Sequence, residues 1–224
     1  MSTYSRKDPS PRLRELLTMY GSMHEHGEAF LGKASADTFP GISLALHIER
    51  IKLLIQRTGA QNVLDYGAGK GQLYGFRNKV FPGHSAPVDS IQDYWDVDYV
   101  ELYDPAYPPH SRRPTGRYDG VISTDVMEHL PEEDLPWILD EIFGYADKFV
   151  FLAIASYPAD KRLPNGDNAH ITIRPPPWWA DLLDATACRH PKVLWQAHVD
   201  VRWKDDAGAY RREEHLLTRQ GVPE

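Results

Sequence analysis

The chain has 224 residues and a formal net charge of −7, and its length predicts one globular domain with at most an added cap. Hydrophobic residues make up 42% and aromatic residues 11% of the sequence, which excludes a disordered chain. A pI near 5.8 and the lack of a basic tract argue against nucleic acid or a membrane surface as a partner. The single Cys188 excludes a disulfide framework, and without a signal peptide or a long apolar segment we expect a cytoplasmic protein.

The first 59 residues predict an N-terminal helical cap or lid over the rest of the chain. The expected elements are a loose arm over 1–10, a helix over 11–24, a loop over 25–41 and a helix over 42–57. Pro11 suits a helix start and Gly59 a helix stop. His24 and His26 lie where such a lid meets a substrate, but they suit a solvated surface equally well.

Strands and helices alternate over 60–224. We expect strands over 62–66, 97–103, 118–124 and 148–156, helices over 70–77, 131–145 and 175–187, an inserted segment over 78–96, and a closing hairpin of 192–202 and 209–219. This order predicts an α/β fold, a Rossmann-like doubly wound sheet with an antiparallel C-terminal edge strand.

A glycine-rich turn follows the first strand. Its glycines are Gly67, Gly69 and Gly71, and Asp65 precedes them. Such a turn exposes backbone N–H groups and lets a ligand approach closely. Gln72 breaks the dinucleotide fingerprint, and Gly71 after Lys70 breaks the P-loop motif. An acid before the glycines suits a ligand with a cationic amine and no pyrophosphate, as in S-adenosylmethionine, while a tight turn without a ligand is the alternative.

Two further strands end in acidic residues. The segment over 97–103 ends in Asp104-Pro105, where a carboxylate is placed to accept hydrogen bonds from ribose hydroxyls. Asp125 and Val126 follow the next strand, at the edge where open α/β sheets bind ligands.

Together these segments resemble the class I S-adenosylmethionine-dependent methyltransferases, in particular those similar to the ubiquinone-biosynthesis O-methyltransferases. The resemblance covers about 60–187 and rests on LDYGAGKG, YDP, YDGVISTDVMEHL, FVFLAIAS and HITIRPPPWWADLL. It implies that the Asp65 turn surrounds the methionine portion, Asp104 the ribose and Asp125-Val126 the reactive end.

The chain departs from that family between its second and third strands. The stretch from Pro105 to Tyr118 is too short for the helix and strand that the family has there. The family's adenine pocket therefore does not carry over, and Tyr107 or the 78–96 insertion are the candidates to line it.

Three groups of residues are candidates for the chemistry. His170, which follows the 148–156 strand, is our first choice as a general base or substrate contact, since the relatives commonly carry a histidine there; shaping its loop is the alternative. Glu128-His129 resembles a pattern associated with a divalent metal, but we predict no metal site and keep His129 as a candidate proton acceptor. We expect Trp178 and Trp179 to be core residues rather than a platform for a sulfonium.

We therefore predict a methyltransferase that uses S-adenosylmethionine and acts on an oxygen or nitrogen of a small molecule. No nucleic acid or membrane partner is expected, and an oligomer is compatible with the sequence. Three alternatives stay open. The fold can carry another sulfonium reaction such as cyclisation or elimination, it can bind a nucleoside without catalysis, or, least consistent with Gln72, it can act as a nicotinamide oxidoreductase.

Overall fold

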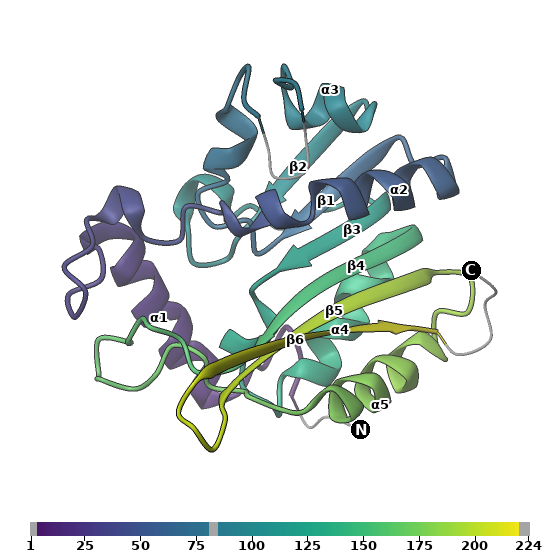
Figure 1. The fold of residues 1–224 in the computed structure, drawn as a ribbon. Helices are drawn as coiled ribbons and strands as arrows, with labels where there is room; N and C mark the ends of the chain where they lie inside the picture. The colour runs from purple at the N-terminus through teal and green to yellow at the C-terminus, as the bar shows by residue number, and fades with distance from the viewer. Residues whose placement is uncertain (1–3, 81–84, 220–224) are drawn as a thin grey trace.

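Six strands form one sheet in the order β2-β1-β3-β4-β5-β6 (Figure 1). The structure is a computed structural model that describes residues 4–80 and 85–219. The strands are β1 (Asn62–Tyr66), β2 (Tyr99–Tyr103), β3 (Tyr118–Thr124), β4 (Ala146–Ser156), β5 (Leu194–Lys204) and β6 (Tyr210–Thr218). Neighbouring strands pair in parallel except β6, which pairs antiparallel with β5 at one edge. The predicted Rossmann-like sheet with an antiparallel C-terminal edge strand is confirmed.

The helices are α1 (Pro11–His26), α2 (Ile48–Thr58), α3 (Ile91–Trp95), α4 (Leu135–Tyr145) and α5 (Pro176–Ala187). Four of the predicted helices are present, although those expected from 42 and 131 begin only at Ile48 and Leu135, and α3 was not predicted as a helix. Ser10 caps α1 by accepting a hydrogen bond from the N–H of Leu13. Gly59 ends α2 in a left-handed conformation with φ of 62°, which glycine adopts without strain.

Helices cover both faces of the sheet, with α2 and α3 on one side and α4 and α5 on the other (Figure 1). The alternation of side chains along β4 explains how one strand serves both layers. Phe149 and Phe151 pack in the layer of α2 and α3, and Val150 and Leu152 in the layer of α4 and α5. This double burial accounts for the nearly continuous apolar sequence of β4.

Three connections decide the shape of the sheet edge next to β2. The helix expected over 70–77 is one 3-10 turn, Gln72–Gly75, because Gly71 enters it in a left-handed conformation and the chain is extended again after Gly75. The predicted insertion carries α3, and its residues 81–84 lie outside the described residues. The link between β2 and β3 holds only the short turn Pro108–His110, so β2 is the edge strand.

The cap lies beyond the carboxyl ends of the strands and is smaller than predicted. Leu16, Tyr20 and Met23 of α1 pack against Leu163 and Ala169 of the loop after β4. In contrast, α2 packs on the sheet, so the cap comprises α1 and the segment that follows it rather than all of residues 1–59. Within the described ranges, no helix has the length and apolarity needed to cross a membrane.

Candidate active site

A cavity of about 470 Å³ lies where β1, β2 and β3 end, beneath α1. The strand ends that line it are Gly67 and Gly69 after β1, Asp104 and Pro105 after β2, and Asp125 and Val126 after β3. Its volume lies in the range of small-molecule pockets. Its position, at the carboxyl edge of a mainly parallel sheet, is where open α/β folds bind ligands.

The glycine turn offers a ligand no free backbone N–H group, which corrects the expectation from the sequence. The N–H groups of Gly67 and Ala68 donate to Tyr103 O (2.7 and 3.1 Å), and that of Gly69 donates to Asp104 Oδ2 (3.0 Å). The N–H group of Gly71 donates to Ala68 O (3.0 Å). Those of Lys70 and Gln72 donate to Phe39 O and Pro40 O of the cap (both 2.9 Å). The cap engages two of these donors, those of Lys70 and Gln72, and the others are engaged by the end of β2 or within the turn itself. No long helix follows the turn either, so its main chain is not an anion-binding cradle.

The glycines of this turn permit close packing of its neighbours. Gly67 and Gly69 have φ values of 88° and 57°. A Cβ atom on Gly67 would lie 2.4 Å from Val126 Cγ2, and one on Gly69 would lie 2.5 Å from Phe39 O. The turn therefore brings the end of β3 and the cap together at the cavity wall.

Asp104 presents an anionic acceptor to the cavity. Its carboxylate accepts hydrogen bonds from Gly69 N (3.0 Å) and Ala106 N (2.9 Å), which leaves acceptor capacity on both oxygens. Burial raises the pKa of Asp104, whereas these backbone hydrogen bonds lower it. His24 Nε2 lies 4.0 Å from Asp104 Oδ2, and burial lowers the pKa of His24 to about 4. A carboxylate beside a neutral imidazole suits the binding of vicinal hydroxyls.

The proposed adenine contacts do not reach this cavity. Tyr107 stacks on His24 with ring centroids 4.8 Å apart and is absent from the cavity wall. No described residue of the 78–96 insertion lines the cavity. Pro105, next to the ribose acid, does line it.

Asp65 and Gly71, both predicted to bind the cofactor, lie outside the cavity wall. The Tyr74 hydroxyl donates a 2.9 Å hydrogen bond to Asp65 Oδ2, and burial raises the pKa of Asp65 to about 7. A Cβ atom on Gly71 would lie 2.5 Å from Leu102 Cδ1, so this glycine allows the turn to pack on β2. Both residues support the turn from below in the structure.

Asp125 and Val126, predicted at the reactive end, line the cavity together. Asp125 has a left-handed φ of 55°. Burial raises the pKa of Asp125, and a hydrogen bond from Ser43 of the cap lowers it. The cap thus contacts the end of β3 as well as the glycine turn.

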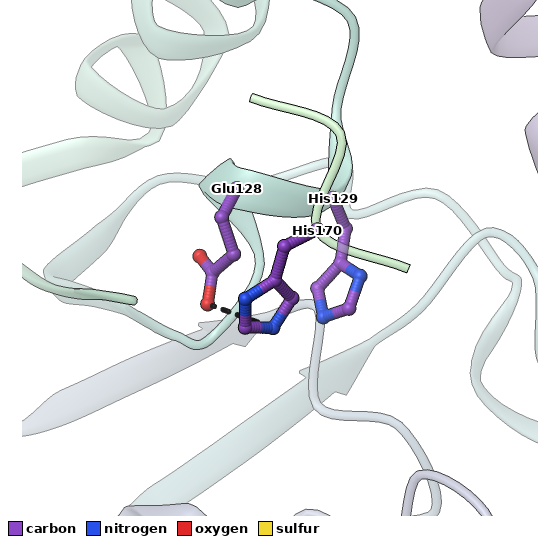
Figure 2. A group of neighbouring side chains, drawn as sticks. All are labelled: Glu128, His129 and His170. Atoms are coloured by element: carbon purple, nitrogen blue, oxygen red, sulfur yellow. Dashed lines mark ion pairs between the residues drawn. The ribbon is translucent and has the colours of Figure 1, made fainter. Parts of the chain in front are cut away.

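Glu128, His129 and His170 lie side by side, although His170 is distant in sequence (Figure 2). The N–H groups of Ile171 and Thr172 donate to Glu128 O (2.9 and 3.0 Å), which holds the two segments together. The imidazole centroids are 4.8 Å apart, and His170 Nε2 lies 3.9 Å from Glu128 Oε1. Both histidines line the cavity, and their role in the chemistry stays a prediction.

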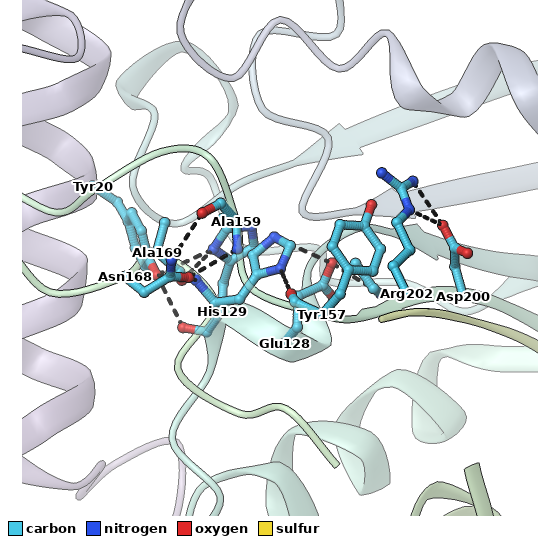
Figure 3. A network of polar contacts seen from close by, with 11 residues as sticks. Tyr20, Glu128, His129, Tyr157, Ala159, Asn168, Ala169, Asp200 and Arg202 are labelled. Atoms are coloured by element: carbon cyan, nitrogen blue, oxygen red, sulfur yellow. Dashed lines mark hydrogen bonds and ion pairs between the residues drawn. The ribbon is translucent and has the colours of Figure 1, made fainter. Parts of the chain in front are cut away.

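Main-chain carbonyl groups fix the tautomer of both histidines. His129 Nδ1 lies 2.8 Å from Ala169 O (Figure 3). His170 Nδ1 lies 2.6 Å from Tyr157 O. Because a carbonyl oxygen only accepts, Nδ1 carries the proton and Nε2 presents a lone pair. Burial lowers the pKa of both imidazoles, to about 3 for His129. Each neutral ring can accept a proton or bind a metal through Nε2.

The same three residues fit a divalent metal. One ligand atom of each lies within 4.8 Å of the other two. Ligand atoms about 2.1 Å from one ion lie at most about 4.2 Å apart, so small rotations would close the group. Glu128 Oε2 is buried without a hydrogen-bond partner among the described residues, and a metal would satisfy it. The sequence predicted no metal site, because nothing in it places His170 beside Glu128 and His129.

The residues that line the cavity include two groups of different chemistry, which we call the apolar half and the charged half. The apolar half contains Arg6, Leu13, Leu17, Tyr66, Leu130, Trp137 and Ile138. The charged half contains Lys33, Asp37, Phe39, Tyr157, Asp160, Lys161 and Arg202. Sequence reasoning missed Arg6, Phe39 and Lys161, because they lie on an arm and loops without a motif. The only available signal was that loops over a site collect binding groups.

Three other residues singled out in the sequence, Trp178, Trp179 and His26, lie away from the cavity wall, as does Arg174 of the HITIRPPPWWADLL segment. Trp179 is fully buried in the core and its Nε1 donates to Arg174 O, which confirms the core interpretation. Trp178 packs against the same core. Arg174 pairs with Glu132 on the surface, and His26 is exposed, unlike His24.

Comparisons with known proteins give little further guidance. No protein-family model matches the chain, and neither does any curated protein. Among solved structures, the chain is similar to a DhpI–SAH complex at 14% sequence identity and a TM-score of 0.35, over 93% of this chain and 81% of that chain. A likeness this distant supports no conclusion about function. The proposal below therefore rests on the geometry of the cavity.

Proposed function

We propose that this chain binds S-adenosylmethionine in the cavity and transfers its methyl group to an oxygen or nitrogen of a small molecule. The observation that carries the proposal is the meeting of three neighbouring strand ends at one cavity. Gly67 lines the cavity, Asp104 offers acceptors for ribose hydroxyls, and Asp125 lines the same cavity as the two histidines. The sequence resemblance to class I methyltransferases supports the same assignment of these positions.

The glycine turn also supports a ligand without phosphate. A dinucleotide needs free main-chain donors and a helix N-terminus for its pyrophosphate, and this turn has neither. Asp104 and Asp125 would repel a phosphate in the same space. A sulfonium ligand, with its positive charge, suits these carboxylates better.

His170 is placed to take the acceptor's proton. In the transfer, the sulfonium carbon–sulfur bond breaks as the acceptor oxygen or nitrogen bonds the methyl group, and S-adenosylhomocysteine leaves. The acceptor's proton passes to Nε2 of His170, whose Nδ1–H remains on Tyr157 O. The cap of α1 and the residues that follow it would keep water from the reacting atoms.

The test is calorimetric titration with S-adenosylmethionine and S-adenosylhomocysteine, followed by mass analysis of turnover products. We expect Asp104→Ala to weaken binding of both nucleosides by about 1–3 kcal/mol, because ribose hydroxyls lose their acceptor. Asp104→Asn, which keeps an oxygen for Gly69 N, controls for collapse of the turn. Lack of nucleoside binding by the wild type contradicts the proposal. Methylthioadenosine as the product would replace methyl transfer with cyclisation or elimination.

Metal-assisted transfer is a second candidate, favoured by the unpartnered Glu128 Oε2. Glu128, His129 and His170 would hold the ion, which would supply Lewis acidity toward an acceptor oxygen. We expect the wild type, but not Glu128→Gln, to bind Mn²⁺ or Zn²⁺ in calorimetry. Equal metal binding by both proteins would place the ion elsewhere.

A further inference from the structure

The charged half of the cavity contains three cationic side chains, and only one of them is neutralised. Arg202 donates two hydrogen bonds to Asp200 Oδ2, at 3.1 and 2.7 Å (Figure 3). In the described residues, Lys33 and Lys161 each have no carboxylate within ion-pair distance, although both line the cavity. The two lysines interact electrostatically, since the charge of Lys33 lowers the pKa of Lys161.

Lys161 is the more buried of the two lysines. Its ammonium lies 4.8 Å from the centre of the Phe39 ring, and its side chain is half-buried. Asp37 and Asp160 line the same half but are exposed and form no ion pair with it. Burial and the charge of Lys33 lower the pKa of Lys161, and the charges of Asp125 and Glu28 offset this only in part. A partly desolvated ammonium without an ion-pair partner is stabilised when an anion binds it.

The loop that carries Lys161 is held in place before any ligand binds. Ala169 N donates to Lys161 O (3.1 Å), and Leu163 N donates to Asp167 O (2.8 Å). Leu163 and Ala169 are fully buried against Leu16 and other residues of α1. Because the backbone is fixed, little ordering is needed to bring the ammonium to a ligand.

We propose that Lys161, assisted by Lys33, binds a carboxylate of a small molecule in the charged half of the cavity. The identity of that molecule rests on the proposed function, under which either the methyl acceptor or the amino-acid end of the donor supplies the carboxylate. Lys161 lies near the proposed base, since its charge lowers the pKa of His170 after the larger effect of burial. The acceptor is therefore the source that we favour, and it would belong to the class of small organic acids.

The first arm of the test addresses the donor. Calorimetry compares S-adenosylhomocysteine with methylthioadenosine, which lacks the amino-acid end, on wild type, Lys161→Met and Lys161→Arg. If the donor supplies the carboxylate, Lys161→Met lowers the affinity for S-adenosylhomocysteine by about tenfold, as expected for loss of one charge-assisted contact. The affinity for methylthioadenosine then stays unchanged. Lys161→Arg retains the affinity.

The second arm addresses the acceptor without needing the donor. Benzoate and its neutral counterpart benzamide are titrated into the same proteins by NMR. If the acceptor supplies the carboxylate, Lys161→Met lowers the affinity for benzoate by about tenfold and leaves the affinity for benzamide unchanged. Lys192→Met, an exposed lysine away from the cavity, is the matched control and should bind all four compounds as the wild type does.

The outcomes separate this inference from the proposed function. A Lys161→Met protein with wild-type melting temperature and wild-type affinity for both carboxylates overturns the inference, as does a wild type that binds neither carboxylate. A wild type that binds benzoate through Lys161 but neither nucleoside overturns the proposed function and leaves the carboxylate site standing.

Discussion

At the scale of single residues, Asp65 shows how one carboxylate can be used for structure instead of binding. It precedes the glycine turn, where the sequence predicts a ligand contact, yet it is 4% exposed and bonded to Tyr74. Its pKa is about 7 in the folded protein against about 3.9 in an unfolded chain, so its contribution lowers the free energy of unfolding progressively as the pH rises from about 4 to about 7.

We therefore expect Asp65→Asn to raise the free energy of unfolding at pH 8 by about 1–3 kcal/mol, with little change at pH 4.5. The asparagine oxygen can still accept from Tyr74. Urea denaturation at both pH values measures the effect, and the exposed Asp206→Asn is the control. A tenfold loss of S-adenosylhomocysteine affinity in Asp65→Asn would return this residue to the binding site.

His170 provides the corresponding test of chemistry. If its Nε2 accepts the acceptor's proton, His170→Asn lowers kcat by at least about 100-fold, the lower end of general-base effects. Nucleoside affinity should remain within about twofold, since a base contributes little to donor binding. Single-turnover kinetics and calorimetry separate the two quantities, with His26→Asn as an exposed control. Lost affinity with unchanged kcat would make His170 a binding residue.

At the scale of elements, the N-terminal arm ties the cap to the strands beneath it. Arg6 donates to Tyr103 OH (2.8 Å), Tyr66 OH (3.0 Å) and Glu141 Oε2 (2.9 Å), so one side chain joins the arm to β1, β2 and α4. Glu141 is only 11% exposed at its side chain, which makes this ion pair more than a surface contact. Arg6 and Tyr66 both line the cavity, so this contact forms part of its wall.

We expect Arg6→Met to lower the free energy of unfolding by about 2 kcal/mol, because Glu141 and two tyrosine hydroxyls lose a partner in a partly buried site. Arg12→Met, which removes exposed ion pairs from the neighbouring helix, should cost less than about 0.5 kcal/mol. Denaturant titration of both variants gives the comparison. Equal losses would mean that the arm is not an anchor.

Elements also show what the sequence could and could not predict. Strand positions followed from apolar runs such as Asn62–Tyr66, because burial on both faces leaves a strong pattern. The helix expected over 70–77 was wrong, because only a short 3-10 turn forms between Gly71 and the end of that turn at Gly75. The spacing of apolar residues does not reveal that Gly71 enters this turn in a left-handed conformation. The strand ends predicted one part of the cavity wall, Gly67 and Gly69, Asp104-Pro105 and Asp125-Val126, whereas most of the wall comes from the arm, the cap and loops. Lys161 escaped prediction because tertiary contacts alone place its loop.

At the scale of the whole molecule, buried imidazoles make the free energy of unfolding depend on pH. Burial lowers the pKa of His24, His47 and His198 to about 4, against about 6.5 in an unfolded chain. Between these values the unfolded chain binds more protons, so the free energy of unfolding falls as the pH drops. Each imidazole contributes up to about 1.4 kcal/mol per pH unit. His129, with its pKa of about 3, acts in the same direction, whereas Asp65 and Glu128, whose pKa values burial raises, act in the opposite direction and offset about two of these four imidazoles.

We expect unfolding free energies to fall steeply from pH 6.5 to pH 4 and to change less above pH 6.5. Arg50 and Glu214 flank His198, and the arginine charge lowers its pKa while the glutamate raises it, after the larger effect of burial. His198→Asn should flatten the profile by roughly one proton's slope, about 1.4 kcal/mol per pH unit. The exposed His26→Asn should leave it unchanged. A profile that is flat between pH 4 and 6.5 would contradict this account.

The contact between the cap and the glycine turn has a consequence for hydrogen exchange. The amide hydrogens of Lys70 and Gln72 are hydrogen-bonded to the main chain of residues 39 and 40 in the cap. These two hydrogen bonds must therefore break whenever the cap separates from the glycine turn. These two amides should exchange slowly even without a ligand, as a built-in gauge of cap opening. A ligand that enters without lifting the cap leaves their protection unchanged, and one that must part the two layers first shows itself as a burst of exchange during association.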